Sequence, residues 1–109
     1  MSIINRGVIE VDPVVVAGWL ENGEILLVDV REEEEWAEER VAGAILSPMS
    51  DFEADRFPSE EGKRLVVMCK VGRRSEAIAR KMLEHGAFPV YNMAGGLNGW
   101  KEADLPTQR

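Results

Sequence analysis

Cys69 is the only cysteine of this 109-residue chain, and it directly follows a short apolar run, Leu65–Met68. The next residues supply one glycine and three cations: Lys70, Gly72, Arg73 and Arg74. Cations and a helix N-terminus lower the pKa of a nearby thiol, and the thiolate is the nucleophilic form of cysteine. We therefore expect Cys69 to be a reactive nucleophile rather than an inert core residue.

The segments on either side of Cys69 should position its thiol. The run Leu65–Met68 is typical of a buried strand, and Ser75 is a favourable N-cap for an amphipathic helix from about Glu76 to His85. A loop between a strand and a helix can point its backbone N–H groups at its own first residue. We expect the N–H groups of residues 70–75 to surround the sulfur, with Gly72 at a positive φ angle that permits the turn.

The rest of the chain alternates strand and helix patterns. Strands are predicted at Gly7–Val11, Ile25–Val30, Gly43–Leu46 and Pro89–Asn92, and helices from Asp12 to Gly23, over Glu32–Glu39 and from Gly95 through Trp100. A loop or irregular helix is expected over Met49–Phe57, and a free tail over Pro106–Arg109. This alternation predicts an α/β fold: a three-layer α/β/α arrangement around a mostly parallel, five-stranded sheet, as one domain of residues 1–109. Cys69 then lies at the carboxyl end of a strand, where such sheets bind ligands.

Composition excludes several classes of function. The net charge of −7 argues against nucleic-acid binding. No apolar run approaches the ~20 residues that a membrane span requires. A single cysteine cannot form an internal disulfide, which favours a reducing, cytoplasmic location. With one histidine and one cysteine the chain offers no structural metal site, and we expect no cofactor.

The charges are segregated along the chain. Residues 29–39 contain seven acids and one base, whereas residues 63–81 contain seven bases and one acid. An acidic protein that gathers cations around its one thiol is suited to bind a small anion there.

Four segments, in this order, resemble the motifs of rhodanese-like single-domain sulfurtransferases. They are Val28-Asp29-Val30-Arg31 with Glu35-Trp36; Gly43-Ala44-Ile45 with Pro48; Cys69-x-x-Gly72-x-Arg74-Ser75; and Gly95-Gly96 with Trp100 and Leu105-Pro106. The resemblance covers nearly the whole chain and implies the same five-stranded fold. One departure is Arg40, which stands where the family usually has a histidine; we expect it to affect loop packing or the pocket rim more than chemistry.

The resemblance implies sulfur transfer through a persulfide on Cys69. The loop residues Lys70, Val71, Gly72, Arg73, Arg74 and Ser75 would bind an anionic donor, either thiosulfate or a persulfide. One of the two arginines would face the sulfonate while the other braces the loop. Ser75 would cap the helix or donate to the outer sulfur. We expect Asp29, Arg31 and Glu35 to be structural, with Glu35 close enough to pair with Arg31 four residues earlier. No second thiol can resolve the persulfide, so the acceptor must be external: a thiol, cyanide or a protein.

Two alternatives remain open on sequence alone. Cysteine-dependent phosphatases and arsenate reductases resemble Cys-x5-Arg, with arginine at the sixth residue after cysteine. Here Arg74 is the fifth residue, and Met68 replaces the histidine that usually precedes the phosphatase cysteine. The other alternative is a sulfur-relay or regulatory binding module whose acceptor is a partner protein.

Overall fold

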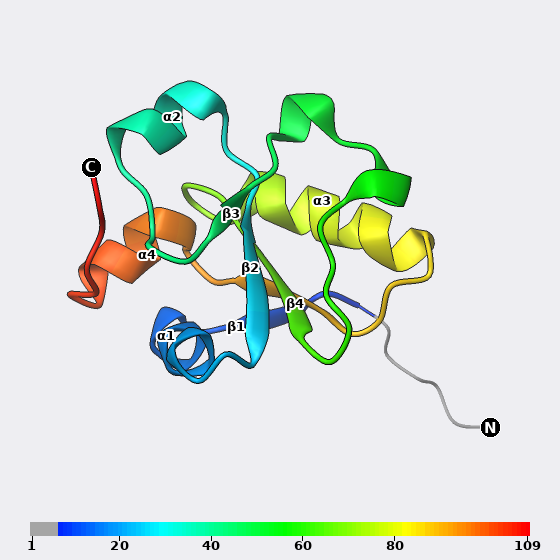
Figure 1. Ribbon diagram of the computed structural model, residues 1–109, viewed down its shortest axis with the longest axis horizontal. Coiled ribbons are helices and arrows are strands. Elements are labelled where there is room, and N and C mark those ends of the chain that lie inside the picture. Colours follow the sequence, from blue (N-terminus) through cyan, green and yellow to red (C-terminus); the bar gives the residue numbers. More distant parts are fainter. Residues whose placement is uncertain (1–6) are drawn as a thin grey trace.

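The computed structural model describes residues 7–109 and contains five strands and four helices. The strands are β1 (Ile9–Val11), β2 (Ile25–Asp29), β3 (Ile45–Leu46), β4 (Arg64–Met68) and β5 (Val90–Met93). The helices are α1 (Pro13–Glu21), α2 (Glu33–Glu38), α3 (Arg73–Glu84) and α4 (Gly96–Glu102), with 3-10 turns η1 (Met49–Asp51) and η2 (Ala54–Arg56) between β3 and β4. The sheet order is β1-β5-β4-β2-β3, and every neighbouring pair is parallel (Figure 1). The predicted α/β architecture is thus confirmed.

Helices cover both faces of the sheet. Side chains alternate along β4, so that Val66 and Met68 pack on the side of α1 and α4, whereas Val67 and Cys69 pack on the side of α3. Figure 1 shows α1 and α4 on one side of the strands and α3 on the other. Complete burial of one such aliphatic side chain contributes about 1.5–3 kcal/mol, so the two layers hold the carboxyl end of β4 firmly in place.

Local sequence signals explain where α1 begins and ends. The Asp12 carboxylate accepts a hydrogen bond from the backbone N–H of Val14 at 3.1 Å, and Pro13 occupies the first helical position. The chain leaves the helix through Asn22 and then Gly23, which has a φ angle of +70°. These positions agree with the prediction of a helix from Asp12 to Gly23.

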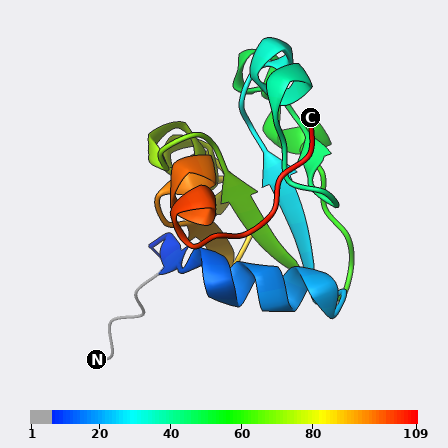
Figure 2. The same cartoon turned by 90° about the vertical axis from the view of Figure 1, so that its left-hand side faces the viewer.

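The helix α2 lies apart from the two core layers. It contains no buried residue, and its N-terminus is closed by a capping box in which Glu32 and Glu35 each bond the other's backbone N–H. Figure 2 shows α2 beyond the carboxyl end of β2, on the side of the sheet where β4 also ends. An acidic helix therefore stands next to the loop that contains the thiol.

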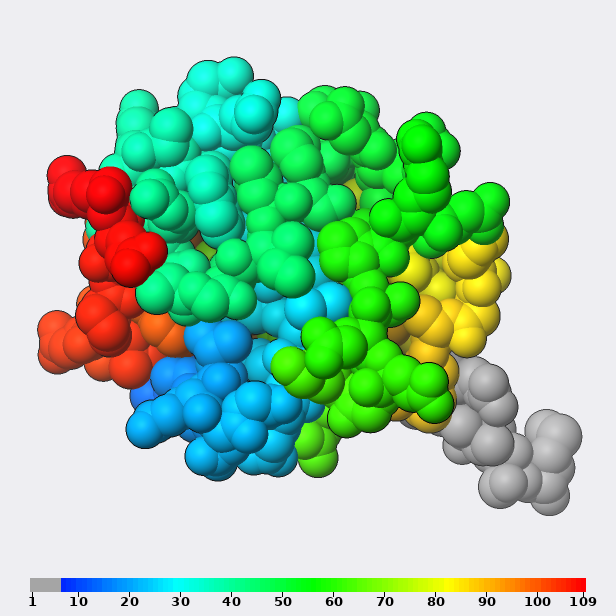
Figure 3. All heavy atoms as spheres, in the orientation of Figure 1, coloured from blue at the N-terminus to red at the C-terminus, as the bar shows by residue number. Residues whose placement is uncertain are grey.

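The C-terminal segment is attached to the protein, which corrects the prediction of a free tail over Pro106–Arg109. The indole N–H of Trp100 donates to the carbonyl of Pro106 at 2.8 Å, and the Thr107 hydroxyl donates to Glu39 at 2.6 Å. Gln108 pairs with Arg40 through two backbone hydrogen bonds of 2.9 and 2.7 Å. Figure 3 shows the segment, in red, lying against the chain near residue 40. The polar composition of the segment gave no sign of these partners.

In the described part of the chain, every helix is too short or too polar to traverse a bilayer.

Candidate active site

Cys69 immediately follows β4, the middle strand of the sheet, and opens the loop that leads into α3. The loop ends at Gly72, which is the N-cap of α3 and has a φ angle of +102°. The helix therefore starts at Arg73, three residues earlier than predicted, and Ser75 is not its cap. Serine is the better general N-cap, but only glycine adopts this positive φ without strain. Ser75 instead lies buried in the first turn.

Hydrogen-bond donors surround the sulfur. The backbone N–H of Gly72 lies 3.1 Å from the Cys69 Sγ, and the Ser75 hydroxyl lies 3.3 Å from it. Burial of Cys69 raises the pKa of its thiol, but hydrogen bonds from the Ser75 hydroxyl and from the backbone N–H groups of Ser75, Gly72 and Val71 outweigh that effect. The net pKa lies below the ordinary value of a cysteine, so the loop favours the thiolate.

The sulfur is not open to solvent in this structure, since Cys69 has a relative exposure of 0%. Lys70 and Val71 on the loop, and Arg73 at the start of α3, are exposed. These exposed side chains lie next to the buried sulfur in sequence.

Arg74 is held by Glu35 on α2. Its guanidinium makes two hydrogen bonds of 2.8 and 3.0 Å to the two carboxylate oxygens, a paired geometry that is among the stronger side-chain contacts. The hydrogen bond from Arg74 is the main reason why the pKa of Glu35 falls to about 2. Arg31 and Glu35 do lie close together, as expected, but Arg31 donates to the backbone carbonyl of Glu35 at 3.3 Å, whereas the Glu35 carboxylate turns toward Arg74 on α3.

Asp29 and Arg31 form a buried ion pair at the end of β2. The Arg31 guanidinium donates to both oxygens of Asp29, at 2.8 to 3.1 Å, and also to the backbone carbonyls of Glu35 and Glu39. Both charged side chains are almost completely buried, but each is compensated by its partner. The pair fixes α2 to the sheet and so positions Glu35 for its contact with Arg74.

Asn92 is a residue of this site that sequence reasoning missed. It lies on β5, is 2% exposed, and accepts a 2.5 Å hydrogen bond from the Ser75 hydroxyl through its Oδ1. Its Nδ2 donates to the carbonyl of Gly72 at 3.1 Å and to the Glu10 carboxylate at 3.0 Å. The available signal was an amide side chain at the end of a predicted strand, because an amide that becomes buried in a sheet requires partners.

The start of α4 supports the loop from the other side. The N–H of Leu97 donates to the carbonyl of Cys69 at 2.8 Å, and the N–H of Asn98 donates to that of Lys70 at 3.0 Å. A Cβ atom on Gly96 would lie 2.6 Å from the carbonyl oxygen of Lys70, which is closer than real contacts allow. The second glycine of the Gly95-Gly96 pair is therefore required for this close approach.

Arg40 contacts α2 rather than the thiol. Its guanidinium donates to the carbonyl of Trp36 at 3.2 Å and lies 5.7 Å from the centre of the Trp36 ring. Both contacts are to α2 and not to the loop that contains Cys69. Arg40 thus packs on α2, and the expectation that it affects loop packing or the pocket rim more than chemistry stays a prediction.

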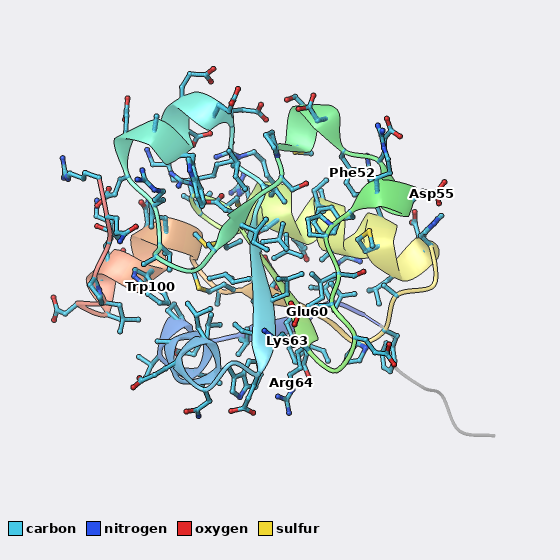
Figure 4. The ribbon with its side chains drawn as sticks, viewed as in Figure 1. Phe52, Asp55, Glu60, Lys63, Arg64 and Trp100 are labelled. Atoms are coloured by element: carbon cyan, nitrogen blue, oxygen red, sulfur yellow. The ribbon has the colours of Figure 1, made fainter. Side chains whose placement is uncertain are left out.

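Two hollows differ in their relation to the loop. One of about 310 Å³ adjoins it and is lined by cations and acids, among them Lys70, Lys101, Arg109 and Glu38. Another of about 680 Å³ lies at the opposite end of the sheet, beside Lys63 and Arg64 at the start of β4 (Figure 4). The second is larger but remote from Cys69. Across residues 7–109, no three His, Cys, Asp or Glu side chains gather so as to hold a metal ion.

A family model and a curated relative show the family of this chain. The sequence model of the rhodanese-like domain matches residues 12–103. The thiosulfate sulfurtransferase GlpE of Coxiella burnetii is 31% identical over 84 residues, which are 77% of this chain and 78% of that protein. An uncharacterized protein of Synechocystis is 35% identical over 83 residues, which are 76% of this chain but 46% of that protein, so this chain spans less than half of that relative.

Solved structures share the fold. A rhodanese-related protein of Thermoplasma volcanium superposes with a TM-score of 0.80 at 23% sequence identity. The match covers 92% of this chain and 97% of that one. At this level of identity the likeness concerns the fold alone.

Proposed function

We propose, since this chain belongs to the rhodanese-like domain family, that it is a sulfurtransferase that carries a sulfane sulfur on Cys69. The observation that carries the proposal is the set of hydrogen-bond donors around one sulfur, which includes the Gly72 N–H at 3.1 Å and the Ser75 hydroxyl at 3.3 Å. These donors hold the pKa of the Cys69 thiol below its ordinary value. These groups stabilise an anion at the position of the sulfur. A persulfide anion formed there would meet the same donors.

The reaction consists of two displacements at sulfur. First, the Cys69 thiolate attacks the outer sulfur of thiosulfate; an S–S bond forms, the S–S bond of thiosulfate breaks, and sulfite leaves with the electron pair. Second, cyanide or a thiolate acceptor attacks the outer sulfur of the Cys69 persulfide, and the Cys69 thiolate is regenerated as the leaving group. Each step passes one neutral sulfur atom between nucleophiles, so no external oxidant or reductant is needed.

Arg73 is our candidate for binding an anionic donor. Arg74 is engaged by Glu35, whereas Arg73 is exposed and takes part in no ion pair within residues 7–109. Exposed Lys70 adds a second cation that is next to Cys69 in sequence. A guanidinium offers two parallel donors to a sulfonate, so thiosulfate fits this edge of the loop better than a neutral donor does.

Intact-mass measurement after incubation with thiosulfate tests sulfur loading. We expect wild-type protein to gain the mass of one sulfur atom, to lose it on addition of cyanide, and to form one thiocyanate per sulfur lost. Cys69→Ser should gain nothing. An unmodified wild type, or a Cys69→Ser variant that gains the same mass, would contradict the proposal.

The second displacement requires an acceptor from outside the chain. Cys69 is the only thiol of the chain, so the persulfide must be discharged by another molecule. A loaded protein that resists cyanide and small thiols but releases sulfur to a protein acceptor would favour the sulfur-relay alternative. A thiol kept free for this cycle requires a reducing compartment, and we propose the cytoplasm.

The phosphatase alternative is disfavoured by the geometry of the loop. Arg74 is the arginine nearest in sequence to the phosphatase position, but its guanidinium is turned to Glu35 by two hydrogen bonds of 2.8 and 3.0 Å. Hydrolysis of an aryl phosphate by wild-type protein, lost in Cys69→Ser, would reverse this judgement.

A further inference from the structure

The Ser75 hydroxyl lies between two acceptors inside the protein. Its Oγ is 3.3 Å from the Cys69 Sγ and 2.5 Å from the Asn92 Oδ1. Ser75 is 0% exposed and Asn92 is 2% exposed, so water does not replace either contact. A hydroxyl group has one hydrogen to donate. It can serve the sulfur or the amide oxygen, but not both.

The amide of Asn92 cannot turn to relieve this competition. Its Nδ2 lies 3.1 Å from the carbonyl oxygen of Gly72 and 3.0 Å from the Glu10 carboxylate, and both of these groups only accept. This network assigns the nitrogen to that side and the oxygen to the side of Ser75. Asn92 therefore presents an acceptor to the Ser75 hydroxyl.

We propose that Asn92 is a positioning residue that restrains the ionisation of Cys69 by holding the hydroxyl hydrogen of Ser75. When Cys69 is a thiol, its S–H donates to the Ser75 Oγ, and the Ser75 O–H donates to the Asn92 Oδ1, so all three groups are satisfied. When Cys69 is a thiolate, Ser75 can donate to the sulfur only by leaving the buried Oδ1 without a donor. That unpaired acceptor costs free energy and opposes ionisation.

The restraint acts together with the groups that favour the thiolate. Hydrogen bonds from the Ser75 hydroxyl and from the backbone N–H groups of the loop keep the pKa of Cys69 below its ordinary value. Asn92 limits how far the pKa falls, because its Oδ1 competes with the sulfur for the Ser75 hydrogen. Because the thiolate is the form that oxidants attack, this arrangement protects the chain's one thiol between turnovers. The inference rests on the proposed role of Cys69 as the nucleophile.

The charged groups around the thiol come from several elements. Arg74 of α3 interacts with Cys69 and is neutralised by Glu35 of α2. Asp29, at the end of β2, is neutralised by Arg31, and Glu10 of β1 accepts from Asn92. None of these partners changes when Asn92 is replaced, except the contact with Glu10. A change in the pKa of Cys69 can therefore be traced to the Ser75 hydroxyl or to the two contacts of the Asn92 Nδ2, with Glu10 and with the carbonyl of Gly72.

The test is the pKa of Cys69, measured from the pH dependence of alkylation by iodoacetamide without any sulfur donor. Asn92→Leu keeps the approximate shape of the side chain but removes the acceptor, so the Ser75 hydroxyl is free for the sulfur. One redirected hydrogen bond to an anion should lower the pKa of Cys69 by about 0.5 to 1. An unchanged or raised pKa would overturn the proposal.

A double-variant cycle separates this mechanism from a purely structural one. If Asn92 acts through the Ser75 hydroxyl, Asn92→Leu should leave the pKa of Cys69 unchanged in a Ser75→Ala background. If Asn92 acts only by holding the carbonyl of Gly72 or the Glu10 carboxylate, the shift should persist there, and the proposal is wrong. Near-UV circular dichroism of each variant verifies native packing.

Asn92→Asp keeps the test decisive if the leucine variant does not fold. A carboxylate holds the Ser75 hydrogen more strongly, so the pKa of Cys69 should rise, and this rise should be larger when the Ser75 hydroxyl is present than in the Ser75→Ala background. Equal rises in both backgrounds would show an effect of charge alone and refute the proposal. Because ionisation is measured without thiosulfate, a protein that fails to load sulfur would refute the proposed function but not this inference.

Discussion

Arg73 and Arg74 are neighbours in sequence with different surroundings. Arg74 is half-buried and paired with Glu35, whereas Arg73 is exposed beside the loop. The first helical turn directs these two side chains about 100° apart, so one faces α2 and the other does not. At the residue scale, this difference supports the proposal that Arg74 braces the loop and that Arg73 binds the donor.

Replacement of Arg73 should therefore weaken donor use without weakening the fold. We expect Arg73→Gln to lower kcat/KM for thiosulfate by about 3- to 10-fold, as the loss of one exposed charged contact would do, with little change in the free energy of unfolding. Arg80→Gln, on the same helix two turns farther on, is the matched control and should leave kcat/KM unchanged. Steady-state thiocyanate formation measures both. Equal activity of Arg73→Gln and wild type would show that another group binds the anion.

Two elements far apart in the chain meet at the pair Glu35–Arg74. Glu35 lies on α2, which contributes no buried residue, and Arg74 lies in the first turn of α3. Their hydrogen bonds, together with the Asp29–Arg31 pair, connect an otherwise weakly packed helix to the loop that contains Cys69. At the scale of elements, α2 is held to the loop by charge rather than by apolar burial.

The stabilisation from Glu35 should depend on pH. Because its folded pKa is lowered from 4.5 to about 2, the carboxylate stabilises the fold above pH 4.5, and this contribution disappears as pH falls toward 2. At pH 7, Glu35→Gln should lower the free energy of unfolding by about 1–2 kcal/mol, less than the full shift implies because the pair is partly exposed to solvent.

Urea unfolding between pH 7 and pH 3 measures this difference. The deficit of Glu35→Gln relative to wild type should shrink steadily below pH 4.5. Glu34→Gln, the exposed neighbour on α2, should show no deficit at any pH. A deficit of equal size in both variants, or one that does not depend on pH, would contradict the assignment.

At the scale of the whole molecule, the C-terminal segment connects two helices that are far apart in the sequence. Residues 106–108 connect α4 to the end of α2 through Trp100, Glu39 and the backbone of Arg40. The same segment ends at Arg109, which lines the hollow beside Lys70. The C-terminal segment thus links α4 to the end of α2 beside this hollow.

Substitution of Gln108 tests whether the backbone hydrogen bonds of the C-terminal segment stabilise the protein. Gln108→Pro removes the N–H that donates to the carbonyl of Arg40 at 2.7 Å, whereas Gln108→Ala retains it. The loss of one backbone hydrogen bond should cost about 1 kcal/mol and lower Tm by about 4–8 °C. Differential scanning calorimetry of the two variants gives the comparison. Equal Tm values would mean that the segment contributes nothing to stability.

Local physics was enough to predict much of this protein from its sequence. Apolar runs of strand length marked β2 and β4, capping residues marked α1, and the requirement for a tight turn gave Gly72 its positive φ angle. Each depends on residues within a few positions of one another. The same signals placed Cys69 at the carboxyl end of a strand and predicted that backbone N–H groups would surround its sulfur.

Only the tertiary structure decided which distant side chains meet. Arg74 pairs with a carboxylate 39 residues away, Ser75 meets an amide 17 residues away, and the C-terminal segment pairs with Arg40. These contacts follow from the strand order β1-β5-β4-β2-β3, which brings the ends of β5 and β2 to either side of the loop after β4. Sequence spacing favoured the local pair of Arg31 with Glu35 and a capping role for Ser75. Ser75 instead meets the buried Asn92 on β5, because burial makes an unpaired polar group costly. Glu35 meets Arg74 because the fold brings α2 beside the first turn of α3.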